Sequence, residues 1–174
     1  MLKKAILFLA IPALFATVSC GDKKKGGDEV PGMSQYDLSS YGAHIVLNVP
    51  DTTKTKLEVA AQSSGSIEIK SGKDFQISVT PGEGDFALKK SDISSDEVKK
   101  FKRFVIDEPT ALIWESQVSG MESEFHFYTV IKAGKDSYLI EDIKDGDSFN
   151  EAAVRKMMEA AKSAKAKESP ATNS

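Results

Sequence analysis

The sequence predicts an α+β fold in which an antiparallel β-sheet of about seven strands is covered by two α-helices. The first observation is a set of short segments in which apolar and polar residues alternate, each followed within three residues by glycine, serine or proline. The second is a pair of segments with helical spacing that interrupt these strands and begin with capping sequences. Together they predict the order ββββ-α-βββ-α.

The first four predicted strands cover residues 44–49, 57–61, 67–69 and 75–79. In the first of them, Ile45, Leu47 and Val49 alternate with the residues of the opposite face. The three strands of the second group cover residues 112–115, 125–131 and 138–143. Short, turn-rich links such as 63–66 and 133–136 require antiparallel neighbours.

Two capping boxes predict where the helices begin. Ser94 and Glu97 have the spacing of an N-cap and the third helical position, and Val98, Phe101 and Phe104 follow as an apolar stripe. Ser148 and Glu151 repeat the capping pattern before a second helix. Its predicted buried side is Val154, Met157, Met158 and Ala161.

The first 20 residues have the pattern of an export signal. Lys3 and Lys4 precede an apolar stretch over residues 5–16, which is too short to span a bilayer and has the length of a signal-peptide core. Small residues at 17–19 then lead to Cys20, the only cysteine in the chain. We predict a signal peptide over residues 1–19.

The run Thr17-Val18-Ser19-Cys20 resembles the lipobox of bacterial lipoproteins, in the looser form typical of Bacteroidota and spirochaetes. The resemblance implies cleavage before Cys20 and acylation of its thiol, so that Cys20 anchors the chain in a lipid bilayer without a spanning segment. Residues 21–25 lack the acidic cluster of surface-exported Bacteroidota lipoproteins. We therefore expect a location at the outer membrane, facing the periplasm. The alternative is an ordinary secretory signal with an incidental cysteine.

Composition divides the rest of the chain into three parts. Residues 20–35 are charged and glycine-rich, and we interpret them as the lipidated cysteine and a flexible linker. Residues 36–165 are the predicted single α+β domain, and residues 166–174 are predicted to be a disordered tail.

The charge balance argues against a nucleic-acid-binding protein. The chain has 23 basic and 26 acidic side chains, a net charge of −3, and removal of the two signal-peptide lysines would make it −5. With Cys20 used for lipid, no disulfide can form. The domain must be stabilised by its apolar core.

The predicted order of strands and helices over residues 40–165 resembles the PsbP-like fold of extrinsic photosystem proteins and of a nuclear-import factor. This resemblance depends on element order and on no sequence motif. It implies a binding or assembly role, because members of that fold act mostly as partners of other proteins.

Aromatic residues in three successive strands supply the candidate binding surface. The alternation places His126 and Tyr128 on one face of their strand and Phe125 and Phe127 on the other. One face should be core. We predict that Trp114, His126 and Tyr128 line a shallow groove for a protein or peptide partner, since such side chains combine apolar area with a polar tip.

The sequence gives less support to a catalytic or metal site than to the aromatic binding surface. Asp142, Asp145 and Asp147 lie close together in sequence, but the spacing fails the EF-hand pattern. The two histidines, His44 and His126, have no further ligand at metal-binding spacing. The sequence has no phosphate loop or nucleophile elbow. We therefore predict no catalytic residues, no metal and no cofactor.

Two functional interpretations follow. The first is a membrane-anchored lipoprotein whose non-catalytic domain binds a partner in the cell envelope. The alternative is a small envelope hydrolase or isomerase with a site around His126, Glu141 and Asp142, which would require those side chains to meet in a pocket. The sequence does not predict the ligand or the oligomeric state.

Overall fold

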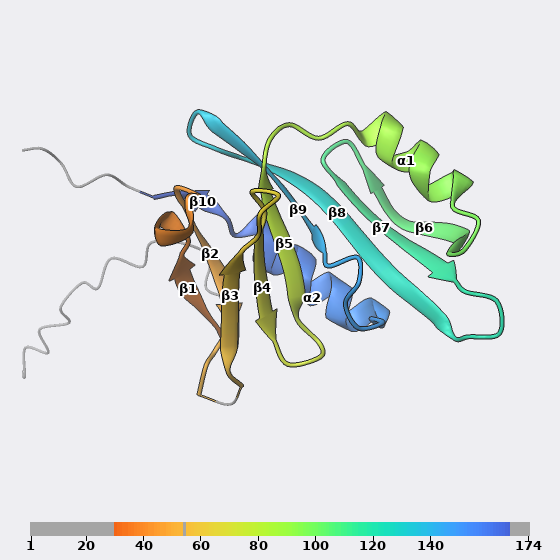
Figure 1. The fold of residues 1–174 in the computed structure, drawn as a ribbon, viewed down its shortest axis with the longest axis horizontal. Helices are drawn as coiled ribbons and strands as arrows, with labels where there is room; N and C mark the ends of the chain where they lie inside the picture. The colour runs from red at the N-terminus through yellow and green to blue at the C-terminus, as the bar shows by residue number, and fades with distance from the viewer. Residues whose placement is uncertain (1–29, 54, 168–174) are drawn as a thin grey trace, which may run out of the picture.

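A computed structural model describes residues 30–53 and 55–167, and within them it has an α+β fold with two antiparallel sheets and two α-helices (Figure 1). The larger sheet has the strand order β3-β4-β5-β9-β8-β7-β6, and the smaller one has the order β1-β2-β10. The predicted signal peptide and Cys20 lie outside the described residues.

The strands of the larger sheet are β3 (Leu57–Ala61), β4 (Ile67–Ser71), β5 (Gln76–Pro81), β6 (Lys100–Glu108), β7 (Ala111–Gln117), β8 (Ser123–Ala133) and β9 (Asp136–Asp142). The smaller sheet contains β1 (Met33–Asp37), β2 (Ile45–Pro50) and β10 (Lys165–Ala166), and a short 3-10 helix η1 (Ser39–Tyr41) follows β1. The seven strands that the alternation predicts correspond to β2, β3, β4, β5, β7, β8 and β9. The positions of these strands are therefore confirmed, but β2 belongs to the smaller sheet, so the prediction of a single sheet that holds all seven is wrong.

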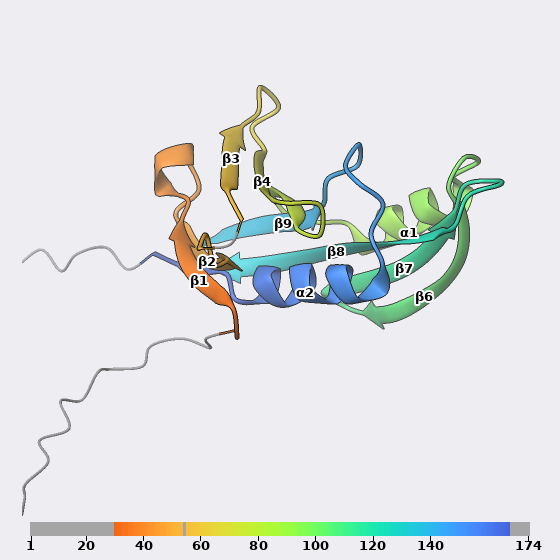
Figure 2. The ribbon, with the colours of Figure 1, turned by 90° about the horizontal axis from the view of Figure 1, so that it is seen from below.

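Helix α2 (Glu151–Lys162) covers one face of the larger sheet and lies along β8 (Figure 2). Its buried residues are Ala153, Val154, Met157, Met158, Ala160 and Ala161. They join apolar residues of both sheets in the main core, for example Leu47 of β2 and Phe127 of β8. The predicted buried side of this helix is confirmed.

Helix α1 (Phe86–Ser95) covers the other face of the larger sheet, over β6 and its neighbours (Figure 2). The Asp85 carboxylate caps it by accepting a hydrogen bond from the Leu88 N–H (2.9 Å). Ile93 is the one α1 residue buried in the structure, and Leu88 is 59% exposed. Helix α1 therefore has much less apolar attachment than α2.

The predicted helix after residue 94 is wrong: residues 100–108 form strand β6. Register shifts between Phe101 and Arg103, and again between Phe104 and Ile106, mark bulges in this strand. The first bulge adds one residue, so Phe101 and Phe104 face the same side although they are three residues apart. In the sequence, the two aromatic residues therefore have the same three-residue spacing as residues on one face of a helix.

Both predicted N-caps are also wrong. Ser94 lies in the last turn of α1, where its hydroxyl donates to the Lys90 carbonyl (2.8 Å). The N-cap of α2 is Asn150, whose side chain accepts from the Ala153 N–H (2.9 Å). Ser148 instead donates to the Glu124 carboxylate (3.1 Å). Serine and asparagine are both good caps, so the choice depends on tertiary contacts.

The element order therefore becomes five strands, a helix, four strands, a helix and a short strand. Strand β1 begins at Met33, inside the predicted linker, and pairs antiparallel with β2. Strand β10 extends to Ala166, one residue into the predicted tail, and pairs with the other edge of β2. The smaller sheet lies at one end of the molecule, and α1 and β6 lie at the other (Figure 1).

Candidate functional site

Strands β7 and β8 place Trp114, His126 and Tyr128 on the face that α1 covers. Trp114 is directly opposite His126 in the antiparallel register, and their rings stack with centroids 5.2 Å apart. Tyr128 belongs to the small core of this face, whereas Phe127 belongs to the main core under α2. The predicted alternation of β8 is therefore confirmed.

The three predicted binding residues do not form an open surface, because α1 covers them. Their exposed fractions are 8% for Trp114, 7% for His126 and 4% for Tyr128. The Phe86 ring of α1 meets the Tyr128 ring edge-on, with centroids 5.1 Å apart. A partner can reach this face only at its margin, where a pocket opens.

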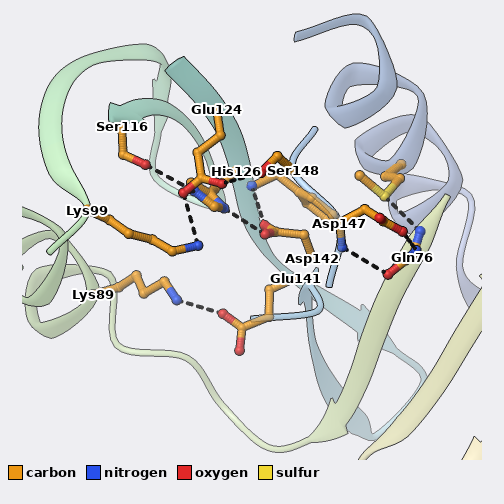
Figure 3. Close-up of polar contacts among 12 residues, drawn as sticks. Gln76, Lys89, Lys99, Ser116, Glu124, His126, Glu141, Asp142, Asp147 and Ser148 are labelled. Atoms are coloured by element: carbon orange, nitrogen blue, oxygen red, sulfur yellow. Dashed lines mark hydrogen bonds and ion pairs between the residues drawn. The ribbon is translucent and has the colours of Figure 1, made fainter. Parts of the chain in front are cut away.

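The pocket has a volume of about 320 Å³, within the range of small-ligand sites. It lies between α1, the loop after α1, the face of β7 and β8, and the end of β9 (Figure 3). Its lining comprises Lys89, Asp92, Ile93, Asp96, Lys99, Trp114, His126, Glu141, Asp142, Lys144 and Asp145. Charged side chains of both signs thus surround an apolar floor made by Ile93 and Trp114.

His126 is the centre of a buried hydrogen-bond network in one wall of this pocket (Figure 3). Its Nδ1 lies 2.7 Å from Asp142 Oδ2, and its Nε2 lies 3.1 Å from Ser116 Oγ. Because an ionised carboxylate only accepts, Nδ1–H is the donor to Asp142. The imidazole orientation is thereby fixed by partners on two other strands.

Asp142 reaches His126 because β9 leaves β8 at this residue. The pairing of the two strands reaches the pair Tyr128 and Glu141, and Asp142 pairs only with Ile77 on the β5 side. Its Oδ1 accepts the Phe127 N–H (2.8 Å), in the place where the ladder would have continued. One carboxylate therefore satisfies a backbone donor and orients an imidazole.

A second carboxylate, Glu124, lies on the other side of His126. Its Oε1 is 3.4 Å from His126 Nε2 and 3.0 Å from Lys99 Nζ, and its Oε2 accepts the Ser148 hydroxyl. Burial raises the pKa of Glu124, but the hydrogen bond from Lys99 and the neighbouring His126 outweigh it and lower the pKa below its ordinary value. Glu124 therefore stays ionised at neutral pH.

Glu141, which the sequence groups with His126 and Asp142, has a different partner. It accepts a 2.6 Å hydrogen bond from Lys89 of α1, and both side chains are more than four-fifths buried. The structure thus brings His126 and Asp142 into contact and directs Glu141 toward α1. All three still line the same pocket.

The contacts Ser116–His126–Asp142 follow the order of a nucleophile, a general base and an orienting carboxylate. Ser116, however, is only 1% exposed and does not line the pocket. A buried hydroxyl that a substrate cannot approach serves as a structural partner of the imidazole. The arrangement therefore holds His126 rigidly at the pocket wall.

Sequence reasoning did not find Ser116, Glu124 or Lys89. Ser116 lies two residues from Trp114 and Glu124 lies two residues from His126, so the two-residue period of a strand places each pair on one face. Lys89 comes from a helix that the pattern did not predict. No local feature of the sequence could have paired it with Glu141.

The other residues considered for a metal or catalytic site do not meet at one place in the structure. His44 is exposed and immediately precedes β2. Asp147 accepts a hydrogen bond from Gln76 (2.6 Å), whereas Asp142 contacts His126. Among residues 30–53 and 55–167, no group of three His, Cys, Asp or Glu side chains is arranged to hold a metal ion.

Comparison of the chain with protein-family models, with curated proteins and with solved structures gives no match. None of the helices in the described part of the chain is long and apolar enough to cross a membrane.

Proposed function

We propose that this protein is a lipid-anchored bacterial envelope protein whose α+β domain binds a ligand or partner segment in the pocket beneath α1. The observation that carries the proposal is the pocket itself, in which Trp114 forms an apolar floor inside a ring of charged side chains. Apolar lining with a few oriented polar groups is typical of ligand sites. We propose a non-catalytic role, which is supported by the burial of the hydroxyl nearest to His126 outside the pocket, where a substrate would not reach it.

The charges of the pocket rim support recognition of a ligand with both polar and apolar parts. Asp92, Lys144 and Asp145 are exposed lining residues with no ion pair to any other described residue. Most charges deeper in the pocket are already paired, such as Lys99 with Glu124. The rim residues are therefore the charges that remain for a partner.

A charge-swap experiment tests this binding role. Detergent-solubilised envelope components are passed over the immobilised full chain, and we compare the wild type with the double variant Asp92→Lys/Lys144→Glu. The matched control is Asp74→Lys/Lys73→Glu, which swaps two exposed charges in the turn before β5. We expect a component that the pocket variant loses and the control keeps. Equal retention by all three proteins would refute the binding role of the pocket.

The lipid anchor has a separate support and a separate test. The support is the sequence pattern that ends at Cys20, together with its resemblance to a lipobox. We expect labelled palmitate to be incorporated into the wild type and absent from Cys20→Ser, which should also leave the membrane fraction. An unmodified thiol in the mature wild-type chain would contradict the anchor.

A hydrolase is the second candidate, favoured by one observation: the 3.1 Å and 2.7 Å contacts of His126 with Ser116 and Asp142. That function requires Ser116 to become accessible. A fluorophosphonate probe would then label the wild type and spare Ser116→Ala. Because Ser116 is buried, we expect no labelling of either protein, and labelling of the wild type alone would establish the hydrolase instead.

A further inference from the structure

We infer that the pocket contains a recognition site for a primary ammonium group, and that Lys89 of α1 is its intramolecular occupant. The inference deepens the proposed function, since it names the chemical group that the same pocket recognises. The site consists of the Trp114 ring and the Glu141 carboxylate, which line the pocket, and of the face of the Tyr128 ring, which belongs to the buried cluster beside the pocket. Residues of β7, β8 and β9 thus form it, and α1 delivers the cation.

The geometry is that of a bound cation. Lys89 Nζ lies 5.4 Å from the Trp114 ring centroid, 4.9 Å from the Tyr128 ring centroid and 2.6 Å from Glu141 Oε2. Aromatic faces within about 6 Å attract a cation, and the attraction strengthens when water is excluded. Lys89 and Glu141 side chains are 16% and 18% exposed, so the ammonium is largely desolvated.

The hydrogen bond to Glu141 selects the class of cation. A primary ammonium has N–H groups that can donate to the carboxylate while the rings contact its remaining surface. A quaternary ammonium has no such donor and would leave the buried Glu141 oxygen unpaired. The site therefore favours a lysine side chain or an aliphatic amine over choline-like groups.

Helix α1 is attached in a way that permits exchange of this occupant. Ile93 is its one buried residue, and its other contacts with the sheet are mainly charged or aromatic, such as Lys90 with Asp107 and Phe86 with Tyr128. A ligand ammonium that displaces Lys89 replaces one ion pair with an equivalent one. Lys89 therefore acts as a competitor that weakens the binding of a ligand ammonium at this site.

Removal of the competitor is the direct test, and the chain provides its own reporter because Trp114 is the only tryptophan. Lys89→Ala deletes the atoms that n-propylamine can replace. We expect n-propylamine to change Trp114 fluorescence saturably and to bind Lys89→Ala at least about tenfold more tightly than the wild type. The matched control is Lys90→Ala, which removes the adjacent lysine, whose ammonium lies over Phe104 and outside the site.

Further arms define the specificity. 1-Propanol and tetramethylammonium should bind Lys89→Ala much more weakly than n-propylamine, and Glu141→Gln in the Lys89→Ala background should remove the gain. Comparison of the affinities of Nα-acetyl-lysine methylamide and cadaverine distinguishes a peptide lysine from a free amine as the source of the ammonium group. If Lys89→Ala does not fold alone, n-propylamine should restore its folding, as followed by circular dichroism.

Equal amine affinity of the wild type and Lys89→Ala, an equal gain in Lys90→Ala, or an unfolded Lys89→Ala that amine does not restore would each overturn the inference. The proposed function fails differently. It fails when the charge-swap variant at Asp92 and Lys144 retains every captured component, whatever the amines do. A pocket can therefore remain a binding site with Lys89 as a purely structural residue, and the two experiments separate these cases.

Discussion

At the scale of single residues, the site depends on three carboxylates, each of which binds a different set of partners. Asp142 accepts hydrogen bonds from a backbone N–H and from the imidazole of His126. Glu124 forms an ion pair with Lys99 and accepts a hydrogen bond from the Ser148 hydroxyl, and Glu141 forms an ion pair with Lys89. Each is largely buried, so its cost of desolvation is offset only while its partners stay in place. Loss of a partner should therefore be expensive.

Asp142→Ala should lower the free energy of unfolding by about 3 kcal/mol, because the Phe127 N–H and His126 Nδ1–H would lose their common acceptor. Asp142→Asn keeps a carbonyl oxygen for one donor and should lose less. Urea unfolding measures both. Asp145→Ala, at an exposed neighbouring position, should change little. Equal stability of the Asp142 and Asp145 variants would contradict the role of this carboxylate.

The lowered pKa of Glu124 predicts a dependence of stability on pH. A carboxyl whose pKa is lower in the folded than in the unfolded state contributes stability above its ordinary pKa, and this contribution is lost as the pH falls through the folded value. The stability difference between wild type and Glu124→Gln should thus be constant near neutral pH and shrink in acid.

Unfolding of the two proteins between pH 7 and 3.5 tests this expectation in the range where carboxyl groups of about pKa 4.3 titrate. Glu122→Gln, at an exposed position two residues earlier, is the control and should show little difference from the wild type at any pH. A gap between Glu124→Gln and wild type that widens in acid would show that the carboxylate is not the stabilising form.

At the scale of elements, a glycine just before α1 allows the chain to approach the sheet closely. A Cβ atom on Gly84 would collide with the Tyr128 hydroxyl and with Val130 of β8. The backbone of Asp85 also hydrogen-bonds the Tyr128 hydroxyl, whose pKa is raised by burial and by the charges of Glu141 and Asp85. The chain before α1 is therefore positioned by contact with an uncharged tyrosine.

Gly84→Ala should displace the start of α1 and destabilise the protein by about 2 kcal/mol, a usual cost of overpacking. The displacement should also change Trp114 emission, since α1 covers that ring. Urea unfolding and fluorescence measure the two effects. Ser91→Ala, on the exposed side of α1, should show neither. Wild-type stability and emission in Gly84→Ala would mean that the helix is not anchored at this point.

Elements with regular periodicity were predictable from the sequence, and those that depend on partners were not. Strand β9 follows the two-residue period and α2 follows the helical one, because each buries one face. Strands β7 and β8 are covered on both faces, so their buried residues form short continuous runs that also indicate strands. In β6 the bulge moves Phe101 and Phe104 to one face, and this spacing was interpreted as helical. A bulge depends on pairing with β7, which local sequence does not contain.

The candidate site was predictable to a similar degree. Parity along β8 correctly placed His126 and Tyr128 together and opposite Phe127. The contact between His126 and Asp142 depends on the point where β9 separates from β8, and the burial of the aromatic face depends on α1. Both are tertiary features, so the sequence suggested the residues but not their accessibility.

At the scale of the whole molecule, the two sheets share one core. Ile45, Leu47 and Val49 of the smaller sheet belong to the same buried cluster as Met157 of α2 and Ile77 of the larger sheet. The Ser163 hydroxyl after α2 also accepts a hydrogen bond from the Asn48 N–H (2.8 Å). The described chain should therefore unfold as one cooperative unit.

Coincident transitions are the expected result when urea unfolding is followed by far-ultraviolet circular dichroism and by Trp114 fluorescence. The first method reports both sheets and the helices, whereas Trp114 reports the face under α1. Lys135→Glu, in the exposed turn between β8 and β9, should leave the coincidence unchanged. A fluorescence transition at lower urea would instead mean that α1 and its surroundings open before the shared core.

The position of the smaller sheet determines which end of an anchored molecule would carry the tether. Strand β1, which begins within the proposed linker, lies at the end of the domain opposite to α1 and β6 (Figure 1). A tether that joins Cys20 to this end would attach the domain at the end remote from α1, so the attachment point would leave the pocket beneath α1 unobstructed.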